Sequence, residues 1–439
     1  MSANSNDAAS TVSSDSSPTT GPKRRGILGS LREFGPGIIA VLAMMGAGDL
    51  VTASVSGSNY GYNLMWLLAA SLLIRFVIVN IMGRYQVLNL KNQSIIEGYR
   101  DVARWYPWAI GIAAVISGHL LNGYMVRGAG EALASIFTVG DPFLWSCILV
   151  VGSIFVIGKN VYKTIESIMK LLLAMMTVVF LGLAIYSVPD VGEIVRGTIG
   201  FGIPDNTGAI GVFAVALSLI GAVAGSMANF LYPYYVRDKG WRGVGFKKLQ
   251  RNDILFGISS AIVISLSIWV VGAEILRPNG IQVTNLDDIS QALTIHLGTV
   301  GGIIFYLGAF GILYSSVVGF ANGFPKIIVD CLHIIVPARR ERYGDHFEDD
   351  PSFKWFSLFI LVSPIIWAFP GMPGFVTMAV FVTGLQAVVV PLVAIGLLIL
   401  ANKKSHFGEH KANVFENIIL VLTTLLTIWV TVQVVIGWF

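Results

Sequence analysis

A single carboxylate, Asp49, lies near the middle of an apolar run at residues 36–57, which is long enough to cross a membrane. Gly46 and Gly48 come just before it. A carboxylate in the middle of a bilayer costs about 3 kcal/mol on insertion scales, so such residues usually face an internal cavity on an ion or substrate path. Glycine lets the backbone leave the helix and frees carbonyl oxygens. The pattern predicts an oxygen-rich cation site, and the plainer interpretation is an Asp that joins two helices through a hydrogen bond.

A second apolar run, at residues 209–235, contains similar helix-weakening residues. Gly221, Gly225 and Asn229 lower helix propensity, and Pro233 removes a backbone donor. Five spans separate this run from the first, so the two runs begin two halves of opposite orientation. Interrupted helices at corresponding positions of inverted repeats indicate a transporter site near the middle of the membrane.

The composition supports a membrane protein. Of the 439 residues, 55% are hydrophobic and only 12% are charged, whereas soluble domains carry about 25% charged residues. We predict an all-α polytopic membrane protein with eleven transmembrane helices, because eleven apolar segments are long enough to approach or exceed the span of a bilayer. These segments are about 36–57, 62–83, 107–133, 143–158, 164–188, 209–235, 252–275, 298–320, 355–370, 374–401 and 413–438.

Positive charges alternate between loops in a way that predicts orientation. Lys and Arg flank every second connection, and the intervening loops are nearly bare. The positive-inside rule then places the N-terminus in the cytoplasm and, with an odd number of spans, the C-terminus outside a cytoplasmic (inner) membrane. Residues 1–30, rich in Ser, Thr, Asn and Asp over their first part, are expected to form a disordered cytoplasmic segment. The charges that carry the argument include Arg24, Arg32, Arg84, Lys91, Arg100, Lys159, Arg237, Lys248, Arg340 and Lys404.

Several function classes are disfavoured. The net charge of +4 reflects membrane topology, so nucleic acid is not an expected partner. The chain contains no GxxxxGK[ST] motif, which argues against ATP as the driving force. Cys147 and Cys331 have no metal-type spacing, and no nucleophile–base arrangement is visible, so an enzyme is not predicted. The expected partners are the lipid bilayer and a transported cation, with no resident cofactor.

The sequence resembles the Nramp divalent-metal transporters along roughly residues 30–400. This resemblance implies a LeuT-type fold of two inverted five-helix repeats, at about 31–190 and 205–401, with helices 1 and 6 interrupted around a metal ion. Residues 402–439 then form one extra, eleventh helix. The motifs that carry the resemblance are SGSNYGYNLMWLLAAS (56–71), IIEGYRDVARWYP (95–107), VYKTIESIMKLL (161–172), SMANFLYPYYVRD (226–238) and LQAVVVPLVAI (385–395).

The family's metal motif on helix 1, Asp-Pro-Gly-Asn, falls on Gly46, Ala47, Gly48 and Asp49. The first Asp is therefore lost and the final Asn has become Asp, which keeps one carboxylate but moves it by three residues. The resemblance places a metal near Asp49 and the carbonyls of Gly46 and Ala47. Thr52 is positioned to hydrogen-bond this stretch.

The family's helix 6 motif, Met-Pro-His, reads Met227, Ala228 and Asn229. The methionine ligand is kept, and the carbonyl expected to bind metal falls at Ala224. The family histidine associated with proton movement is absent, so the resemblance does not extend to proton coupling. A second family histidine on helix 6 falls at Tyr234.

Two substrate classes remain open. Met227 offers a soft thioether, which favours Mn²⁺, whereas the oxygen donors accept any divalent ion. A lone carboxylate only half neutralises a divalent ion, which favours weak binding of a partly hydrated ion, as in the Nramp-related magnesium transporters that the chain also resembles. The first hypothesis is therefore transport of Mn²⁺ or Mg²⁺ by alternating access. The alternative is a monovalent or small organic cation, with Phe230 and Tyr232 lining its cavity.

Five further residues are candidate elements of the polar pathway. His119 and Asn122 fall approximately where the family has an acidic pair on helix 3, and they share one helical face. Tyr234 lies on the sixth apolar segment, and Thr383 and Gln386 lie on the tenth, where they are expected to face the site.

Overall fold

The computed structural model describes residues 47–89, 91, 93–156 and 161–436, and no strand occurs in these ranges. The helices of the first half are α3 (Ala47–Tyr60), α4 (Met65–Leu88), α5 (Ile95–Val102), α6 (Tyr106–Phe137), α7 (Pro142–Val156), α8 (Val161–Tyr186) and α9 (Val191–Ile199). The middle of the chain forms α10 (Val212–Val223), the 3-10 turn η1 (Met227–Phe230), α11 (Leu231–Asp238), η2 (Val244–Phe246), α12 (Lys247–Val271) and the π-turn η3 (Gly272–Leu276). The remaining elements are α13 (Leu286–Ile335), α14 (Pro337–Tyr343), η4 (Phe347–Asp349), α15 (Pro351–Val362), η5 (Ser363–Ala368), α16 (Phe375–Ala401), α17 (Lys404–Phe407) and α18 (Val414–Ile436).

The protein is a multi-pass helical membrane protein. Within the described residues, eight helical stretches, some of which join consecutive elements such as α10, η1 and α11, are long and apolar enough to cross a membrane. The count is nine if α8 and α9, which meet at a 109° bend, form one broken span. Each of the eleven predicted segments overlaps a helix, but α7 is shorter than a span and the start of the first segment lies outside the described residues. The all-α class is therefore confirmed, and the count of eleven stays a prediction.

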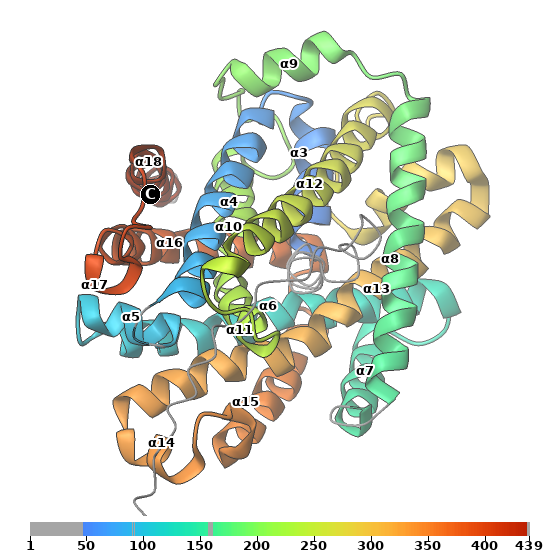
Figure 1. Cartoon of the computed structure of the whole chain (residues 1–439). Helices are drawn as coiled ribbons and strands as arrows, with labels where there is room; N and C mark the ends of the chain where they lie inside the picture. The colour runs from blue at the N-terminus through green and yellow to red at the C-terminus, as the bar shows by residue number, and fades with distance from the viewer. Residues whose placement is uncertain (1–46, 90, 92, 157–160, 437–439) are drawn as a thin grey trace, which may run out of the picture.

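The longest helix, α13, contains a break. Gly298 has φ 59° and ψ −150°, a backbone conformation that only glycine adopts without strain, so α13 is two helices joined at this residue. An Asn285–Asp288 capping box begins the first of them. The second crosses the molecule and packs against α6 (Figure 1).

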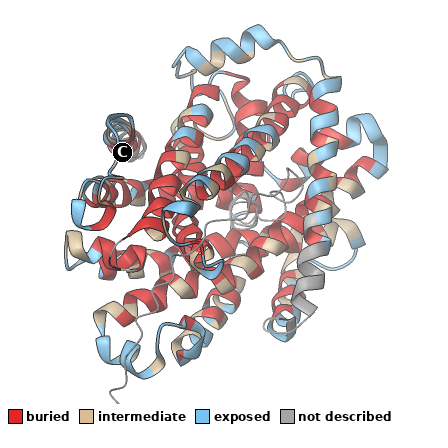
Figure 2. Cartoon of the chain, viewed as in Figure 1, coloured by how far each residue is buried: buried red, intermediate tan, exposed pale blue. Residues whose placement is uncertain are grey.

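Buried residues are concentrated in the helices at the centre of the molecule, and exposed ones lie on the outer helices (Figure 2). Many exposed side chains on the outer helices are large and apolar, such as Leu171, Val178 and Ile185 on α8 and Leu422 and Leu425 on α18. A helix that is apolar on its outer face as well as its inner face suits a hydrocarbon environment.

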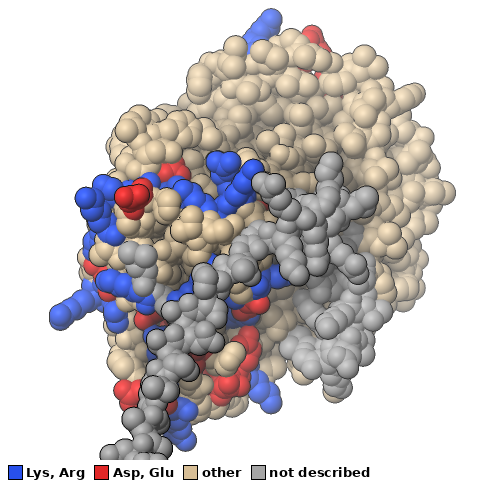
Figure 3. Space-filling model, in the orientation of Figure 1, with Lys and Arg blue, Asp and Glu red and all other residues tan. Residues whose placement is uncertain are grey.

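Basic side chains gather at one end of the molecule, which carries α5, α14 and α17 and is called here the basic end. Figure 3 shows Lys and Arg over these elements, whereas the opposite side of this view is almost uncharged. Polar contacts join the elements: Arg340 of α14 donates to Glu97 of α5, and Lys403 beside α17 donates to the carbonyl of Asp101.

The C-terminal helix α18 packs on α16 and is fixed to α4 by a buried ion pair. Arg84 donates from Nη1 and Nη2 to the two carboxylate oxygens of Glu416 at 3.0 and 2.9 Å. Asn413 and Glu416 cap the start of α18 reciprocally. The Arg84–Glu416 ion pair therefore attaches α18 to the core helix α4.

The helices α10 and α16 touch at their backbones. A β-carbon at Gly221 would lie 1.8 Å from the carbonyl oxygen of Thr383 and 2.9 Å from the amide nitrogen of Ala387. No side chain fits between two backbones at that separation. Gly221 therefore sets the distance between α10 and α16, and with it the position of the residues that follow α10.

Gly221→Ala is expected to lower the melting temperature of the purified protein, because α10 must move away from α16. Overpacking of this kind costs about 1–3 kcal/mol. The matched control is Gly319→Ala on α13, where a β-carbon meets no atom within 4 Å and where alanine slightly favours the helix. Thermal unfolding in detergent measures both variants, and equal melting temperatures would contradict the close contact.

Candidate functional site

Asp49 lies on α3 beside an arginine. Its side chain and that of Arg75 on α4 are only 5% and 2% exposed, and Arg75 Nη1 lies 4.0 Å from Asp49 Oδ2. Arg75 Nε also donates to Asn229 Oδ1 at 3.4 Å. One guanidinium therefore links α3 to the turn η1, the two segments that the sequence predicts to face a cation.

Arg75 is a residue of this candidate site that the sequence analysis missed. It is the single charged residue within the run SLLIRFVIVN (71–80), inside the second predicted segment. The burial cost that singled out Asp49 applies equally to Arg75, because either charge alone in a membrane interior is strongly unfavourable. The burial cost, applied to basic as well as acidic residues within the predicted spans, would have identified Arg75.

The chain is not helical between α10 and η1. Helix α10 ends at Val223, residues 224–226 are non-helical, and η1 begins at Met227. Asn229 Nδ2 donates to the carbonyl of Ala224 at 3.0 Å, and the amide of Met227 donates to Gln386 Oε1 at 3.3 Å. Side-chain amides from η1 and α16 thus satisfy the backbone groups that the missing helical turn leaves free.

Residues of α6, α10 and α16 surround the start of α3. A β-carbon at Gly48 would lie 3.2 Å from both Tyr124 Oη and Thr383 Cγ2, so glycine lets these side chains approach the helix. Thr383 Oγ1 donates to the Ala379 carbonyl at 2.6 Å and lies 3.0 Å from Ser218 Oγ. Thr52 Oγ1 points back to the carbonyl of Asp49 at 3.5 Å.

The structure brings six predicted residues to one place: Asp49, Thr52, Ala224, Asn229, Thr383 and Gln386, with the backbone of Met227. Ala47 begins α3, and Gly46 lies outside the described residues. The described part of the first segment is helical from Ala47 through Gly48 and Asp49. An interruption before α3 lies outside the described residues and stays a prediction.

His119 and Asn122 are held by a different part of the molecule. Trp367 Nε1 donates to His119 Nε2 at 2.9 Å, which leaves Nδ1 as the donor to Ser363 Oγ at 2.7 Å. Asn122 Nδ2 donates to the carbonyls of Ile360 and Val317. The two side chains bond residues of α15, η5 and α13, so in this conformation they join helices.

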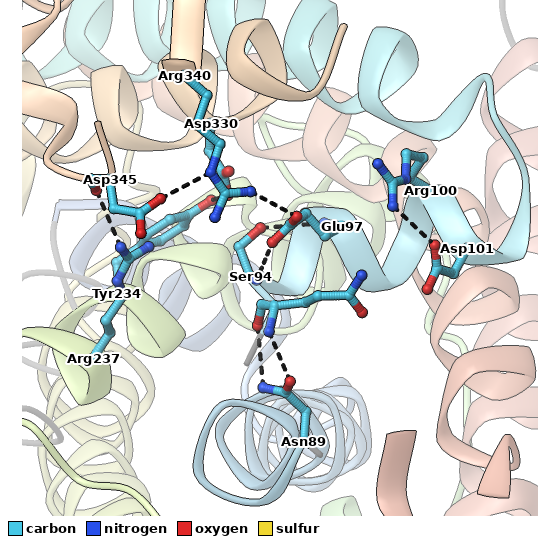
Figure 4. A network of polar contacts seen from close by, with 11 residues as sticks. Asn89, Ser94, Glu97, Arg100, Asp101, Tyr234, Arg237, Asp330, Arg340 and Asp345 are labelled. Atoms are coloured by element: carbon cyan, nitrogen blue, oxygen red, sulfur yellow. Dashed lines mark hydrogen bonds and ion pairs between the residues drawn. The ribbon is translucent and has the colours of Figure 1, made fainter. Parts of the chain in front are cut away.

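Tyr234 belongs to a polar network at the basic end, shown in Figure 4. Its hydroxyl donates to Asp330 Oδ2 at 2.7 Å. Nearby, Arg340 bonds Glu97 at 2.9 Å and Asp345 at 2.8 Å. The partners of these contacts, Asp330, Arg340, Glu97 and Asp345, border a cavity of about 260 Å³ that is also lined by Gln93, Arg237, Trp241 and His333. Tyr234 therefore lies between α11 and α13 near this cavity, and is not grouped with Asp49.

The donors around Asp49 allow only a sparse metal site. Among the described residues no group of three or more His, Cys, Asp or Glu side chains is placed to hold a metal ion. Asp49 and Asn229 offer oxygens, and Met227 offers a thioether. With Arg75 in contact the formal charge of the site is zero, so a cation that binds Asp49 must first compete with the guanidinium.

The chain has a LeuT-type fold, which it shares with solved transporter structures. A mutant of the Eremococcus coleocola manganese transporter superposes with a TM-score of 0.74 over 93% of this chain and 87% of that one, at 17% identity. The nucleobase-cation-symport-1 family transporter Mhp1 in a closed conformation gives a TM-score of 0.52 over 91% of this chain and 92% of that one, at 13% identity.

Sequence comparison identifies the family. The model of the natural resistance-associated macrophage protein-like family, Nramp, matches residues 37–437, and the chain belongs to this family. It is 26% identical to the divalent metal cation transporter MntH of Bacillus subtilis over 69% of this chain and 71% of that protein. It is 25% identical to the MntH of Deinococcus radiodurans over 70% of each.

Proposed function

We propose that this protein is a secondary transporter that moves a divalent metal cation, Mn²⁺ or Mg²⁺, across the membrane by alternating access. The observation that carries the proposal is the buried carboxylate of Asp49, which Arg75 links to Asn229 in η1, just after the non-helical residues 224–226. Relatives named divalent metal cation transporters and a neighbour named a manganese transporter support this substrate class.

Asp49 is the proposed anionic ligand, and the other donors complete the site. Asn229, the carbonyls at Ala224, Gly46 and Ala47, and Met227 supply neutral oxygens and one sulfur, with Thr52, Thr383 and Gln386 fixing the backbone around them. Met227 favours Mn²⁺ over Mg²⁺ because thioethers bind softer ions. The metal is the transported substrate, and neither ATP nor nucleic acid takes part.

A second candidate is a carrier of a monovalent or small organic cation. The observation that favours it is Arg75, because a site with no net charge offers little to a divalent ion. The two aromatic residues expected to line such a cavity are engaged elsewhere. Phe230 packs on Tyr99 with ring centroids 5.6 Å apart, and the Tyr232 hydroxyl donates to Asp253 at 3.0 Å.

In the membrane we place the basic end in the cytoplasm, following the positive-inside rule. The N-terminus is then cytoplasmic, and the C-terminus of an eleven-helix chain is outside the cytoplasmic (inner) membrane. We also propose the division into a cytoplasmic segment at 1–30, a two-repeat core at 31–401 and a C-terminal helix at 402–439. The first of these lies outside the described residues.

Asp49→Asn is expected to abolish metal uptake, because the amide removes the only proposed anionic ligand and leaves Arg75 without its counter-charge. Uptake of ⁵⁴Mn²⁺ into proteoliposomes measures the effect. Asp205→Asn, an exposed position, is the matched control and is expected to transport as the wild type does. Normal uptake by well-folded Asp49→Asn would sink the assignment of Asp49.

Met227→Ala is expected to weaken binding of Mn²⁺ and Cd²⁺ by about tenfold or more and to change Mg²⁺ binding little, because only the softer ions gain from sulfur. Isothermal titration of the three ions compares the variant with wild type. Met372→Ala, at a 41% exposed position, controls for loss of a methionine. An equal loss for all three ions would remove Met227 from the ligand set.

Metal transport is proposed to occur without proton movement, because Asn229 occupies the position of the family's helix 6 histidine. A pH-sensitive dye inside the proteoliposomes is expected to report a constant luminal pH during Mn²⁺ uptake. Acidification that follows uptake and disappears in Asp49→Asn would contradict this proposal.

A further inference from the structure

The contact between Arg75 and Asp49 is looser than two other arginine–carboxylate pairs among the described residues. The guanidinium approaches Asp49 Oδ2 only to 4.0 Å, whereas Arg84 forms two bonds of 3.0 and 2.9 Å with Glu416. Arg339 likewise forms bonds of 3.0 and 2.6 Å with Asp350. Paired geometry of this second kind is typical of ion pairs that hold a structure together.

Asp49 also keeps an unused acceptor. Its Oδ2 atom is buried and has no hydrogen-bond partner among the described residues, although the side chain is only 5% exposed. A buried carboxylate oxygen without a donor is unfavourable, and native structures usually satisfy such atoms with a protein group, water or an ion. The guanidinium provides a counter-charge for the Asp49 carboxylate but does not donate a hydrogen bond to its Oδ2 atom.

The same guanidinium also hydrogen-bonds the side-chain oxygen of Asn229, the second residue proposed to bind the cation. Arg75 Nε donates to Asn229 Oδ1, the oxygen that faces away from the Ala224 carbonyl. A cation bound between Asp49 and Asn229 would therefore take the place of the guanidinium at both oxygens. Because arginine stays protonated in proteins, its charge cannot be removed and must instead move.

We propose that Arg75 is a tethered competitor of the transported cation. In the empty carrier its guanidinium neutralises Asp49, and an arriving cation binds only as the guanidinium leaves. Arg75 thereby lowers the affinity for the cation and provides the positive charge that the empty site needs during its return across the membrane. This inference rests on the proposed function, because it assigns a specificity-determining residue to the same site.

The test is equilibrium binding of Mn²⁺ to the purified full-length chain by isothermal titration, in wild type, Arg75→Gln, Arg75→Lys and Arg75→Gln with Asp49→Asn. Removal of the competitor in Arg75→Gln is expected to tighten Mn²⁺ binding at least tenfold, and the second substitution is expected to cancel that gain. Arg75→Lys keeps a tethered cation and is expected to stay within a few-fold of wild type. The control is Arg127→Gln, which removes an arginine that is paired with Glu131 on a different helix, α6. It is expected to leave the affinity unchanged.

Ser71→Asp provides an independent variant in case Arg75→Gln does not fold. Ser71 lies one helical turn before Arg75, and its buried hydroxyl has no hydrogen-bond partner among the described residues. An aspartate at this i,i−4 position gives the guanidinium a second carboxylate. It is therefore expected to tighten Mn²⁺ binding while Arg75 remains in place.

The outcomes separate this inference from the proposed function. If wild type binds Mn²⁺ and both Arg75→Gln and Ser71→Asp bind it with equal or lower affinity, Arg75 is not a competitor. That result does not affect the proposal of metal transport. Binding in the variants but not in wild type supports the competitor and contradicts metal as the natural substrate. Absence of binding in every folded protein overturns both.

Discussion

The central constraint on this structure is the presence of a carboxylate in the interior of a membrane protein. Asp49 cannot remain charged there without a counter-charge, and Arg75 on the neighbouring helix supplies it. The pair differs from a simple structural bridge because it is loose and leaves Asp49 Oδ2 without a donor. On the proposal above, the guanidinium is the replaceable partner of this pair, as the resting state of a cation carrier requires.

The surrounding structure serves to hold backbone and side-chain groups around this pair. Gly221 brings α10 against the backbone of α16, so that Gln386 reaches the amide of Met227 just after the non-helical residues. Asn229 then divides its amide between Ala224 and Arg75. A shift of α10 relative to α16 would therefore alter both the ligands and the guanidinium, which couples helix packing to occupancy of the site.

Much of this arrangement was predictable from local sequence. Glycine, asparagine and proline marked the irregular stretch after α10, and the cost of burying charge marked Asp49. The same cost marks Arg75, a single charge in the second predicted segment that the sequence analysis did not use. The roles of His119 and Asn122 were not predictable, since their partners on α13, α15 and η5 lie about 200 or more residues away in sequence. The residue type and its spacing along the sequence predict that a polar side chain lies inside the protein. Its hydrogen-bond partner depends on how distant helices pack, which the local sequence does not show.

The most direct test is to locate the ion itself. Anomalous diffraction from crystals soaked in Mn²⁺ is expected to show a peak between α3 and η1, in coordination distance of an Asp49 oxygen, with the Arg75 guanidinium turned away from it. A peak in the cavity at the basic end near Glu97 and Asp330, with Arg75 still against Asp49, would contradict the account.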